Sequence, residues 1–538
     1  MRNIKAISRV TIILASIIVI VIAGIIYYLT LPSPSPSPRL KTLVVAYAGD
    51  IHTLDPLMAV DTDSDEVIAN VYDQLVDYEI TITPDGKKIS NTGKFVPSLA
   101  TSWEISPDGL EYVFHLRQGV KFHNGDPFNA TAVKYTLDRL KKYGWGVLYG
   151  TIEKVEVIDQ YTVKVTLNRE DPLFMHYLWL YSSSILDPIV MEEHGGADPN
   201  ANTWIASHAI GTGPYKLEEW SPGERIVLTA NEDYWRGKPK IDKIIINIIT
   251  EVSSLEMGLI TGSIDGPIES PYHIPFKDVN LLMKTPGIKA ENFTSIAEVE
   301  YFGLNCKIPP FDNVLVRQAM AWATPIDDII TGAAHGWAVP AKSMLGKGMS
   351  GYDPSYWCYS YNLTKAQELL VKAGYPNGFK TEAYIPSGDE LSKSMLTIWQ
   401  AALLKLNIIV DIREVAAPTF WDLLWNGKVP LFAMSWPSFV CDPIYHLKFL
   451  CHSSTIGPGG NWAFYNNTKM DELLTEAYFE KNSTKRNQII GEIQNILAND
   501  VPYIPVWHTT YTYFMKQNVT GFVFYIDTLT RYWYLDIQ

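Results

Sequence analysis

Two spacings of apolar residues alternate along the chain and predict a mixed α/β fold. Apolar residues at every second position or in short unbroken runs predict strands, as at 41–50, which ends in a turn, and at 240–250. Apolar residues three and four positions apart predict helices, as at 129–143 and 392–407. Strand and helix patterns follow each other throughout, so neither an all-helical nor an all-strand protein fits the sequence.

The balance of these patterns changes along the chain. Strand patterns dominate up to about Pro267, helix patterns with short strands such as 407–415 and 431–436 follow, and strand patterns return from 501 onward. This order predicts a discontinuous first lobe into which a second α/β lobe is inserted. Two lobes joined by crossing strands form a hinge beside a cleft, where ligands commonly bind.

The N-terminus has a different character from the rest of the chain. Residues 1–9 carry three basic side chains, and residues 10–29 are almost entirely apolar. Twenty such residues form a helix of about 30 Å, enough to cross a bilayer. Residues 10–29 therefore predict a transmembrane anchor or a cleaved signal, with residues 1–9 cytoplasmic and the body outside the cell membrane. The Pro/Ser spacer at 30–40 predicts an extended arm of roughly 25 Å.

Composition narrows the function of the remaining residues. About 500 residues follow the spacer, which predicts two or three domains. The net charge is −14, and no Lys/Arg cluster occurs beyond the N-terminus, so a nucleic-acid partner is not expected. The 16 Trp and 31 Tyr residues are mostly core candidates, but they also suit a cleft that stacks on flat or ring-shaped ligands.

Export would expose the chain to glycosylation and oxidation. Four cysteines allow three complete disulfide pairings, between which the sequence does not choose. These are Cys306, Cys358, Cys441 and Cys451. Six N-x-[ST] triplets are candidate glycosylation sites. They begin at Asn129, Asn292, Asn362, Asn466, Asn482 and Asn518.

Motifs for catalysis are not evident. No nucleophile triad spacing, H-E-x-x-H or phosphate-binding loop occurs, so neither an enzyme nor a cofactor is expected. His446, Cys451 and His452 lie close together, but without a further fixed ligand they do not predict a metal site. A tethered surface hydrolase remains the alternative from another functional class, and a paired-carboxylate or Ser-His site in the cleft would favour it.

Several segments resemble one protein family in collinear order over about residues 43–525. They include "DIHTLDP", "VYDQLV", "LATSWEISPDGLEYVFHLRQGVKFHNGDPFNATAVKYTLDRL", "GTGPYKLEEWSPGERIVLTANEDYWRGKP", "PPFDNVLVRQAMAWA" and "DELLTEAYFEKNSTKRNQIIGEIQNILANDVPYIPV". These segments resemble the oligopeptide/dipeptide-binding family (family 5) of solute receptors that serve ABC importers. The one altered element is "ATPIDD", where members carry an A-I-D-R helix end; Pro325 predicts an earlier helix end here.

The resemblance implies a two-lobed fold like that of type II periplasmic binding proteins, with an extra domain in the first lobe. Domain I would comprise 41–72, 205–266 and 507–538, domain II 73–204, and domain III, the second lobe, 267–506. Such a receptor is a monomer that captures an extracellular solute and delivers it to ABC permease subunits in the membrane. The resemblance thus implies a binding protein without catalysis.

The resemblance predicts the class of protein and leaves two classes of ligand open. In dipeptide-binding relatives, an Asp between the strand-ending Trp and an Asp-Pro step binds the peptide amine. Trp436 and Asp442-Pro443 align with that pattern, and the amine-binding position falls on Phe439, which carries no charge. The Arg that binds the peptide carboxylate is also absent from 384–394. Two predictions for the ligand remain: a longer peptide bound through its backbone, or an oligosaccharide stacked on aromatic rings.

The predicted ligand-binding residues lie in three parts of the chain. They belong to a first-lobe loop, to the entry into the second lobe, and to the segment "SWPSFVCDP" with a later Trp. The residues are Thr53, Leu54, Tyr301, Asn305, Ser435, Trp436, Pro437, Ser438, Phe439 and Trp462.

Overall fold

The structure is a computed structural model, and it describes residues 14–15, 20–23, 40–294, 298–438 and 440–538. The chain separates into two units, residues 1–41 and Thr42–Gln538. The described residues of the first unit between 14 and 23 are helical. Among the described residues, no helix is long and apolar enough to cross a membrane. Most of the predicted anchor at 10–29, and the spacer up to residue 39, lie outside the described residues.

The first sheet brings together the two ends of a long stretch of sequence. Its strands follow the order β1-β10-β9-β8, with β1 parallel to β10 and the other pairs antiparallel. The bounds are β1 Thr42–Tyr47, β8 Tyr215–Ser221, β9 Arg225–Ala230 and β10 Lys243–Ile248. Leu43, Val45, Ile244 and Ile246 alternate into a buried core, as the sequence pattern requires.

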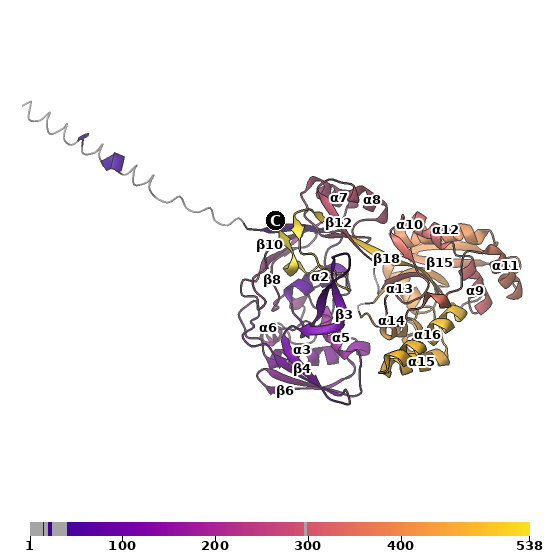
Figure 1. The fold of residues 1–538 in the computed structure, drawn as a ribbon, viewed down its shortest axis with the longest axis horizontal. Coiled ribbons are helices and arrows are strands. Elements are labelled where there is room, and N and C mark those ends of the chain that lie inside the picture. Colours follow the sequence, from indigo (N-terminus) through magenta and orange to yellow (C-terminus); the bar gives the residue numbers. More distant parts are fainter. Residues whose placement is uncertain (1–13, 16–19, 24–39, 295–297, 439) are drawn as a thin grey trace, which may run out of the picture. The chain divides into compact units, whose positions relative to one another are not determined.

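The region between the first strand and β8 forms an additional sheet and a hairpin, packed with short helices (Figure 1). The sheet order is β4-β5-β7-β6, and β2 pairs with β3. The strands are β2 Val76–Ile82, β3 Lys88–Pro97, β4 Ala100–Ile105, β5 Glu111–Leu116, β6 Ile152–Asp159 and β7 Thr162–Leu167. The helices are α2 Thr62–Val71, α3 Ala130–Tyr143, α4 Gly146–Tyr149, α5 Phe174–Trp179 and α6 Pro188–Glu193.

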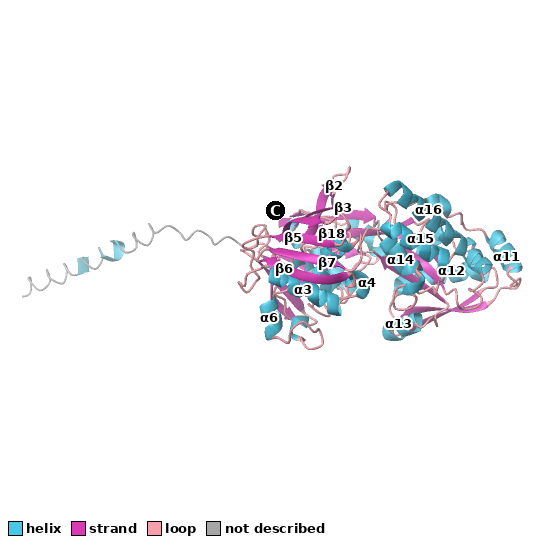
Figure 2. Cartoon of the chain, turned by 90° about the horizontal axis from the view of Figure 1, so that it is seen from below, coloured by secondary structure: helices cyan, strands magenta, loops and turns pink. Residues whose placement is uncertain are grey.

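The largest sheet has the order β11-β18-β13-β17-β15-β16, with β12 and β14 also paired to β18. Its strands are β11 Ile268–Ser270, β12 Ile288–Thr294, β13 Glu298–Leu304, β14 Ala338–Pro340, β15 Lys380–Pro386, β16 Ile409–Val415, β17 Leu431–Pro437 and β18 Tyr503–Lys516. Its helices are α7 Val252–Thr261, α8 Phe276–Met283, α9 Val314–Trp322, α10 Ile326–Ala333, α11 Leu363–Lys372, α12 Glu390–Leu404, α13 Ala417–Trp425, α14 Pro443–Cys451, α15 Thr468–Phe479 and α16 Ser483–Asp500. The helices α14, α15 and α16 pack together (Figure 2). The last strands are β19 Val519–Thr520 and β20 Asp536–Ile537.

Strand β18 belongs to both lobes. Its residues 503–507 pair with β13, and its residues 510–516 pair with β12. A strand shared in this way is the kind of crossing connection that the predicted hinge requires. Figure 1 shows β18 running between the elements of the first and second lobes. The predicted domain boundaries remain a prediction, because Thr42–Gln538 forms one compact unit.

Contacts also join the extra domain to the second lobe away from β18. The Tyr478 hydroxyl on α15 donates a hydrogen bond to the Asp171 carboxylate. Lys481 Nζ lies 2.8 Å from a carboxylate oxygen of Glu170. The rings of Tyr177 and Tyr445 lie 6.3 Å apart between centroids. Residues 170–177 therefore contact residues 445–481 through polar and aromatic side chains.

Three of the predicted glycosylation triplets begin at helix N-caps. The side chains of Asn129, Asn362 and Asn482 accept hydrogen bonds from backbone N–H groups at the starts of α3, α11 and α16. Such a cap satisfies a backbone donor that the helix itself leaves unpaired. An N-x-[ST] triplet is thus also the sequence of an N-cap followed by a small polar residue. All four cysteines are free thiols in the structure, so none of the three disulfide pairings is formed.

Candidate functional site

The candidate site lies at one edge of the largest sheet. Strands β15, β16 and β17 run parallel, and α12, α13 and α14 begin just after them. Strand β13 is antiparallel to β17, so its first residues lie at the same edge. In open α/β sheets, ligands bind at the carboxyl ends of the parallel strands, where loops and helix N-termini converge. The register places Glu298 opposite Pro437, and Glu300 opposite Ser435.

Glu298 connects this edge to the hinge strand. It accepts a hydrogen bond of 2.6 Å from the Ser435 hydroxyl and a second one from the Tyr511 hydroxyl on β18. The Tyr272 hydroxyl is 3.4 Å from the same carboxylate. Burial raises the pKa of Glu298, and the three hydroxyl donors lower it in part. Glu298 is thus a buried carboxylate whose oxygens are satisfied by three different segments.

Glu300 lies two residues further along β13 and has a different environment. Only 6% of its surface is exposed. Among the described residues, its carboxylate has no hydrogen bond and no ion pair. Burial raises the pKa of Glu300 well above its usual value, and the nearby charges of Glu298 and Asp389 raise it further. Its oxygens are not among the fully buried unpaired atoms of the described residues, so this carboxylate lies at the boundary of the core, where solvent or a ligand can reach it. A largely buried carboxylate without a protein partner is unfavourable.

Aromatic rings line the opposite face of β17 and the loop after it. Trp436 lies 5.5 Å from Trp462 and 5.6 Å from Phe449 between ring centroids. Trp421 lies 5.6 Å from Trp462 in an edge-to-face arrangement. Neither the Trp436 nor the Trp462 indole nitrogen has a hydrogen-bond partner among the described residues, although both atoms are buried. The tryptophans form a packed cluster with unused N–H donors.

The other predicted residues on this side of the sheet pack in the core or form hydrogen bonds with the backbone. Tyr301 is buried beneath Tyr503 and Phe432, with its hydroxyl unpaired among the described residues. The Asn305 amide donates hydrogen bonds to the backbone carbonyls of Gly427 and Val429, so it joins the end of β13 to the segment before β17. The Ser438 hydroxyl donates to the Val440 carbonyl.

The prediction for the first-lobe loop concerned Thr53 and Leu54. The Thr53 hydroxyl accepts from the Asp55 backbone, and Leu54 is fully buried in the core around the first sheet. The structure does not bring these side chains to Glu300. Pro437 ends β17 at the sheet edge, and Phe439 lies outside the described residues. The assignment of all ten residues to ligand binding stays a prediction.

Sequence reasoning did not find an apolar pocket beside α14. Its cavity volume is only about 20 Å³, room for about one water molecule, and Tyr445 of α14 is among the residues that line it. Its lining residues are Leu57, Ala59, Trp145, Leu148, Tyr149, Leu180, Tyr181, Ser182 and Tyr445. In sequence these residues form ordinary apolar patterns, and only the fold brings them together.

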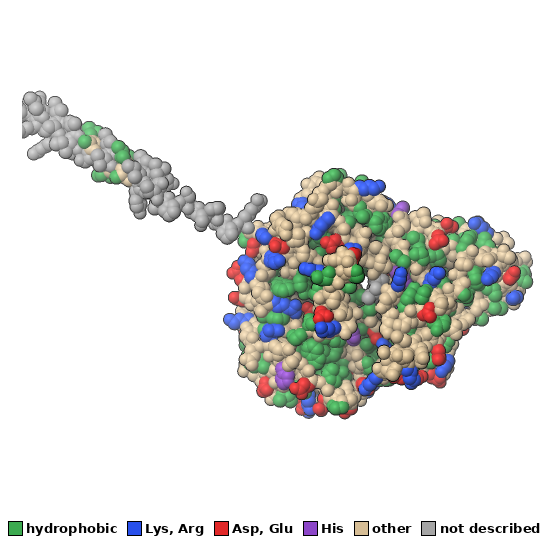
Figure 3. Space-filling view, viewed as in Figure 1, with side chains coloured by type: hydrophobic (Ala, Val, Ile, Leu, Met, Phe, Trp, Pro, Cys, Tyr) green, Lys and Arg blue, Asp and Glu red, His purple; other side chains and the backbone are tan. Residues whose placement is uncertain are grey.

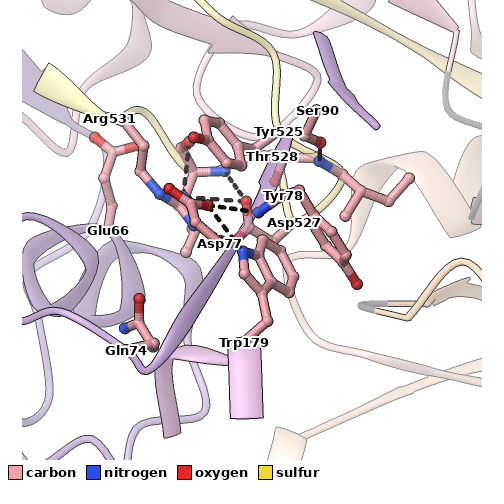
Figure 4. Close-up of polar contacts among 12 residues, drawn as sticks. Glu66, Gln74, Asp77, Tyr78, Ser90, Trp179, Tyr525, Asp527, Thr528 and Arg531 are labelled. Carbon is pink, nitrogen blue, oxygen red and sulfur yellow. Dashed lines mark hydrogen bonds and ion pairs between the residues drawn. The ribbon is translucent and has the colours of Figure 1, made fainter. Parts of the chain in front are cut away.

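A second, polar pocket in the first lobe contains charges that are already paired. Arg531 forms an ion pair of 2.6 Å with Asp527, and Arg236 lies 3.3 Å from Asp77. The indole N–H of Trp179 on α5 donates to Asp77 on β2 (Figure 4). The Ile526 backbone N–H donates to the Ser90 hydroxyl, which holds the C-terminal segment against β3. Among the described residues, these Arg and Asp side chains of the pocket are therefore paired with one another.

The surface and the described side chains limit other functions. On the face shown in Figure 3, Lys and Arg are scattered among acidic and apolar side chains and form no continuous basic patch. Among the residues that the structure describes, no group of three or more His, Cys, Asp or Glu side chains could hold a metal ion.

The mixed α/β fold and the candidate site at the edge of its largest sheet are consistent with a solute-binding protein. The family described as bacterial extracellular solute-binding proteins, family 5 Middle, matches residues 94–458, and this chain belongs to that family. The chain is 30% identical to the "Probable D,D-dipeptide-binding periplasmic protein DdpA" of Escherichia coli K12, over 90% of this chain and 91% of DdpA. It is 31% identical to the glutathione-binding protein GsiB of Salmonella typhi, over 92% of this chain and 94% of GsiB.

Solved structures agree with this assignment. The periplasmic binding protein DppA of Helicobacter pylori, in complex with the peptide STSA, has a TM-score of 0.77 at 28% identity. That similarity covers 92% of this chain and 98% of DppA. HbpA2 of Haemophilus parasuis has the same TM-score at 27% identity, over 92% of this chain and 100% of HbpA2. The predicted family, its mixed α/β fold and its solute-binding function are therefore confirmed, and members of this family are binding proteins rather than enzymes.

Proposed function

We propose that this protein captures an oligopeptide-like solute outside the cytoplasm and delivers it to ABC permease subunits, without catalysis. The observation that carries the proposal is the sheet edge beside the hinge, where Glu298 links β13 and β17 to β18. A solute bound there contacts the strand about which the lobes move. The relatives named for D,D-dipeptides and glutathione, and the DppA complex with STSA, favour a peptide.

Closure of the lobes is the mechanism of delivery in this proposal. A ligand shifts a protein toward the closed form only by binding that form more tightly than the open one. Ser435 and Trp436 from β17, with residues of β13 and β18, would supply contacts that need the lobes together. The permease would then recognise the closed receptor.

An oligosaccharide is the alternative ligand class, and the packing of the tryptophans favours it less. A sugar stacks on an open ring face. The rings of Trp421, Trp436 and Trp462 instead pack against one another at 5.5–5.6 Å. Trp462 is also only 8% exposed. The tethered hydrolase has no observation in its favour.

Thermal unfolding of residues 41–538 with candidate solutes tests the ligand class. We expect tetra- and nonapeptides to raise the Tm, and gluco-, xylo- and manno-oligosaccharides of similar mass to leave it unchanged. Trp436→Ala should reduce the peptide effect, and Trp425→Ala, at an exposed ring, should not. Stabilisation by the sugars alone would overturn the peptide proposal in favour of the alternative.

We further propose that residues 10–29 hold the protein at the outer face of the cell membrane as a monomer. The proposal depends on the apolar run and the basic residues before it. Membrane fractionation of the full chain, compared with a chain that starts at Lys41, tests it. Recovery of the full chain without its first 29 residues would show a cleaved signal instead.

A further inference from the structure

Glu300 is a buried carboxylate whose surroundings do not compensate its charge. On β13, alternate residues face the same side, so Glu298, Glu300 and Phe302 share the face toward α12. Phe302 stacks on Trp399 of α12 with ring centroids 4.1 Å apart, which fixes that face. Asp389, the N-cap of α12, adds a second negative charge near Glu300 rather than a cation.

Polar groups on the neighbouring strand are also unpaired there. Trp507 of β18 is the register partner of Glu300, and its indole nitrogen has no hydrogen-bond partner among the described residues. Thr509, which is 1% exposed, also has an unpaired hydroxyl. Residues 507, 509 and 511 share one face of the strand, and Tyr511 reaches Glu298 on that face. The Thr509 hydroxyl therefore lies on the side of the two glutamates.

The sequence supplies no basic residue to this edge. Residues 298–301, 386–389, 415–416, 435–438 and 440–442 include no Lys or Arg. Lys393, the nearest one along α12, is 42% exposed in its side chain and pairs with Glu414 at 2.7 Å. A cation for Glu300 must therefore come from outside these segments.

We propose that Glu300 binds a cationic nitrogen group of the solute, an ammonium or a guanidinium. The Thr509 hydroxyl is available to accept a hydrogen bond from this group, and the Trp507 indole N–H, which only donates, is available to a carboxylate or carbonyl oxygen. Glu298 holds the strands in register. The inference rests on the proposed solute-binding function and narrows its ligand class. It also accounts for the uncharged Phe439, since the negative charge would come from β13 instead of the loop after β17. The cation has two possible sources, a peptide α-amine or a basic side chain.

Matched peptides distinguish these sources by isothermal titration calorimetry. The probes are tetra-alanine with a free amine, acetylated tetra-alanine, acetyl-Ala-Lys-Ala-Ala and spermidine. We expect wild-type protein to bind at least one cationic probe, and to bind acetylated tetra-alanine weakly. A free-amine preference identifies the N-terminus, and binding of the acetylated Lys peptide identifies a side chain.

Glu300→Gln keeps the side-chain shape and removes the charge. We expect this substitution to lower the affinity for the cationic probe at least about 30-fold. This corresponds to about 2 kcal/mol at 1.4 kcal/mol per tenfold change. Acetylated tetra-alanine should be unaffected. Glu300→Ala is a second variant in case the first does not fold, and Glu382→Gln on β15, which pairs with Arg413 at 2.7 Å, is the matched control.

Proton release provides a readout that a purely structural carboxyl would not change. A cation lowers the raised pKa of Glu300, so binding should release protons in the wild type and not in Glu300→Gln. The groups that face Glu300 are Glu298 on β13, Ser435 on β17, Trp507 and Thr509 on β18, and Asp389 before α12. Calorimetry in buffers of different ionisation enthalpy measures the release.

The outcomes separate this inference from the proposed function. Equal affinity for free and acetylated tetra-alanine, unchanged in Glu300→Gln, would overturn the cation inference and leave the peptide proposal intact. Binding of spermidine alone, lost in Glu300→Gln, would support the cation inference and contradict the peptide proposal. Binding of no cationic probe would overturn the inference.

Discussion

Two groups of buried carboxylates differ in how their charges are compensated. In the first lobe, Glu66 accepts hydrogen bonds from Tyr47, Tyr532 and the Thr530 backbone, at 2.5–2.9 Å. Glu300 on β13 has no hydrogen bond or ion pair among the described residues, although at 6% exposed it is as buried as Glu66 at 7%. A satisfied carboxylate contributes to the fold, whereas an unsatisfied one costs stability unless a ligand supplies the missing charge. This difference separates structural acids from a candidate binding acid.

The largest effect should come from breaking a compensated pair. Arg139 on α3 holds Asp55 at 2.6 Å, and both side chains are at most 3% exposed. Arg139→Met leaves a buried carboxylate unpaired, so the free energy of unfolding should fall by about 3–5 kcal/mol in urea denaturation. Lys134→Met on the same helix removes an exposed ion pair and should cost about 1 kcal/mol or less. Equal losses would show that burial does not decide the cost.

Removing an acceptor from the first-lobe network should have a smaller effect. Glu66→Gln keeps the shape but weakens hydrogen bonds to two tyrosines, so the free energy of unfolding should fall by about 1–3 kcal/mol. Glu476→Gln on α15, in an exposed pair, is the matched control. A Glu66→Gln protein as stable as the wild type would remove the contrast with Glu300.

His273 should make the stability of the first lobe depend on pH. Burial lowers the pKa of His273, but the carboxylates of Glu269, Asp63 and Glu66 outweigh this, and the pKa rises to about 9. Because the folded pKa lies above the usual 6.5, the stabilisation is complete below about pH 6.5 and is lost as pH rises through 9. The slope for one proton is at most about 1.4 kcal/mol per pH unit.

His273→Gln should flatten the fall in unfolding free energy between pH 6.5 and 9. The carboxyl of Glu269 acts in the same direction at lower pH, since burial raises its pKa to about 7 although His273 lowers it in part. His52→Gln, at an exposed ring, is the control. A curve for His273→Gln that matches the wild type would mean that the network does not titrate this way.

The smallest expected change is an increase, rather than a decrease, in the free energy of unfolding. Without ligand, and at a pH high enough to ionise Glu300, Glu300→Gln removes an uncompensated charge and should raise the free energy of unfolding by about 1 kcal/mol. Glu298→Gln, two residues away, should lower it instead, because Glu298 accepts three hydroxyl hydrogen bonds. Thermal and urea unfolding of both variants measure the two changes in free energy. A loss of stability in Glu300→Gln would show that Glu300 stabilises the fold.

The sequence predicted much of the fold but little of the site. The apolar periods identified α3, β10 and α12 near their observed bounds, because each is amphipathic or buried along its whole length. Glu298 and Glu300 passed unnoticed, since "EVEY" reads as an ordinary strand alternation with its polar side in water. The triplets at Asn129, Asn362 and Asn482 suggested glycosylation, and the structure shows helix caps there.

By itself, the sequence determined the family, the mixed α/β class, and the order of strand-rich and helix-rich regions. These depend on local periodicity and on long collinear segments, which are readable one residue after another. Only the tertiary structure decided which charges are paired. Asp55 meets Arg139 from 84 residues away, and Glu298 meets Tyr511 from 213 residues away. Whether a buried acid is compensated depends on such long-range neighbours, so the candidate binding carboxylate became visible only in the fold.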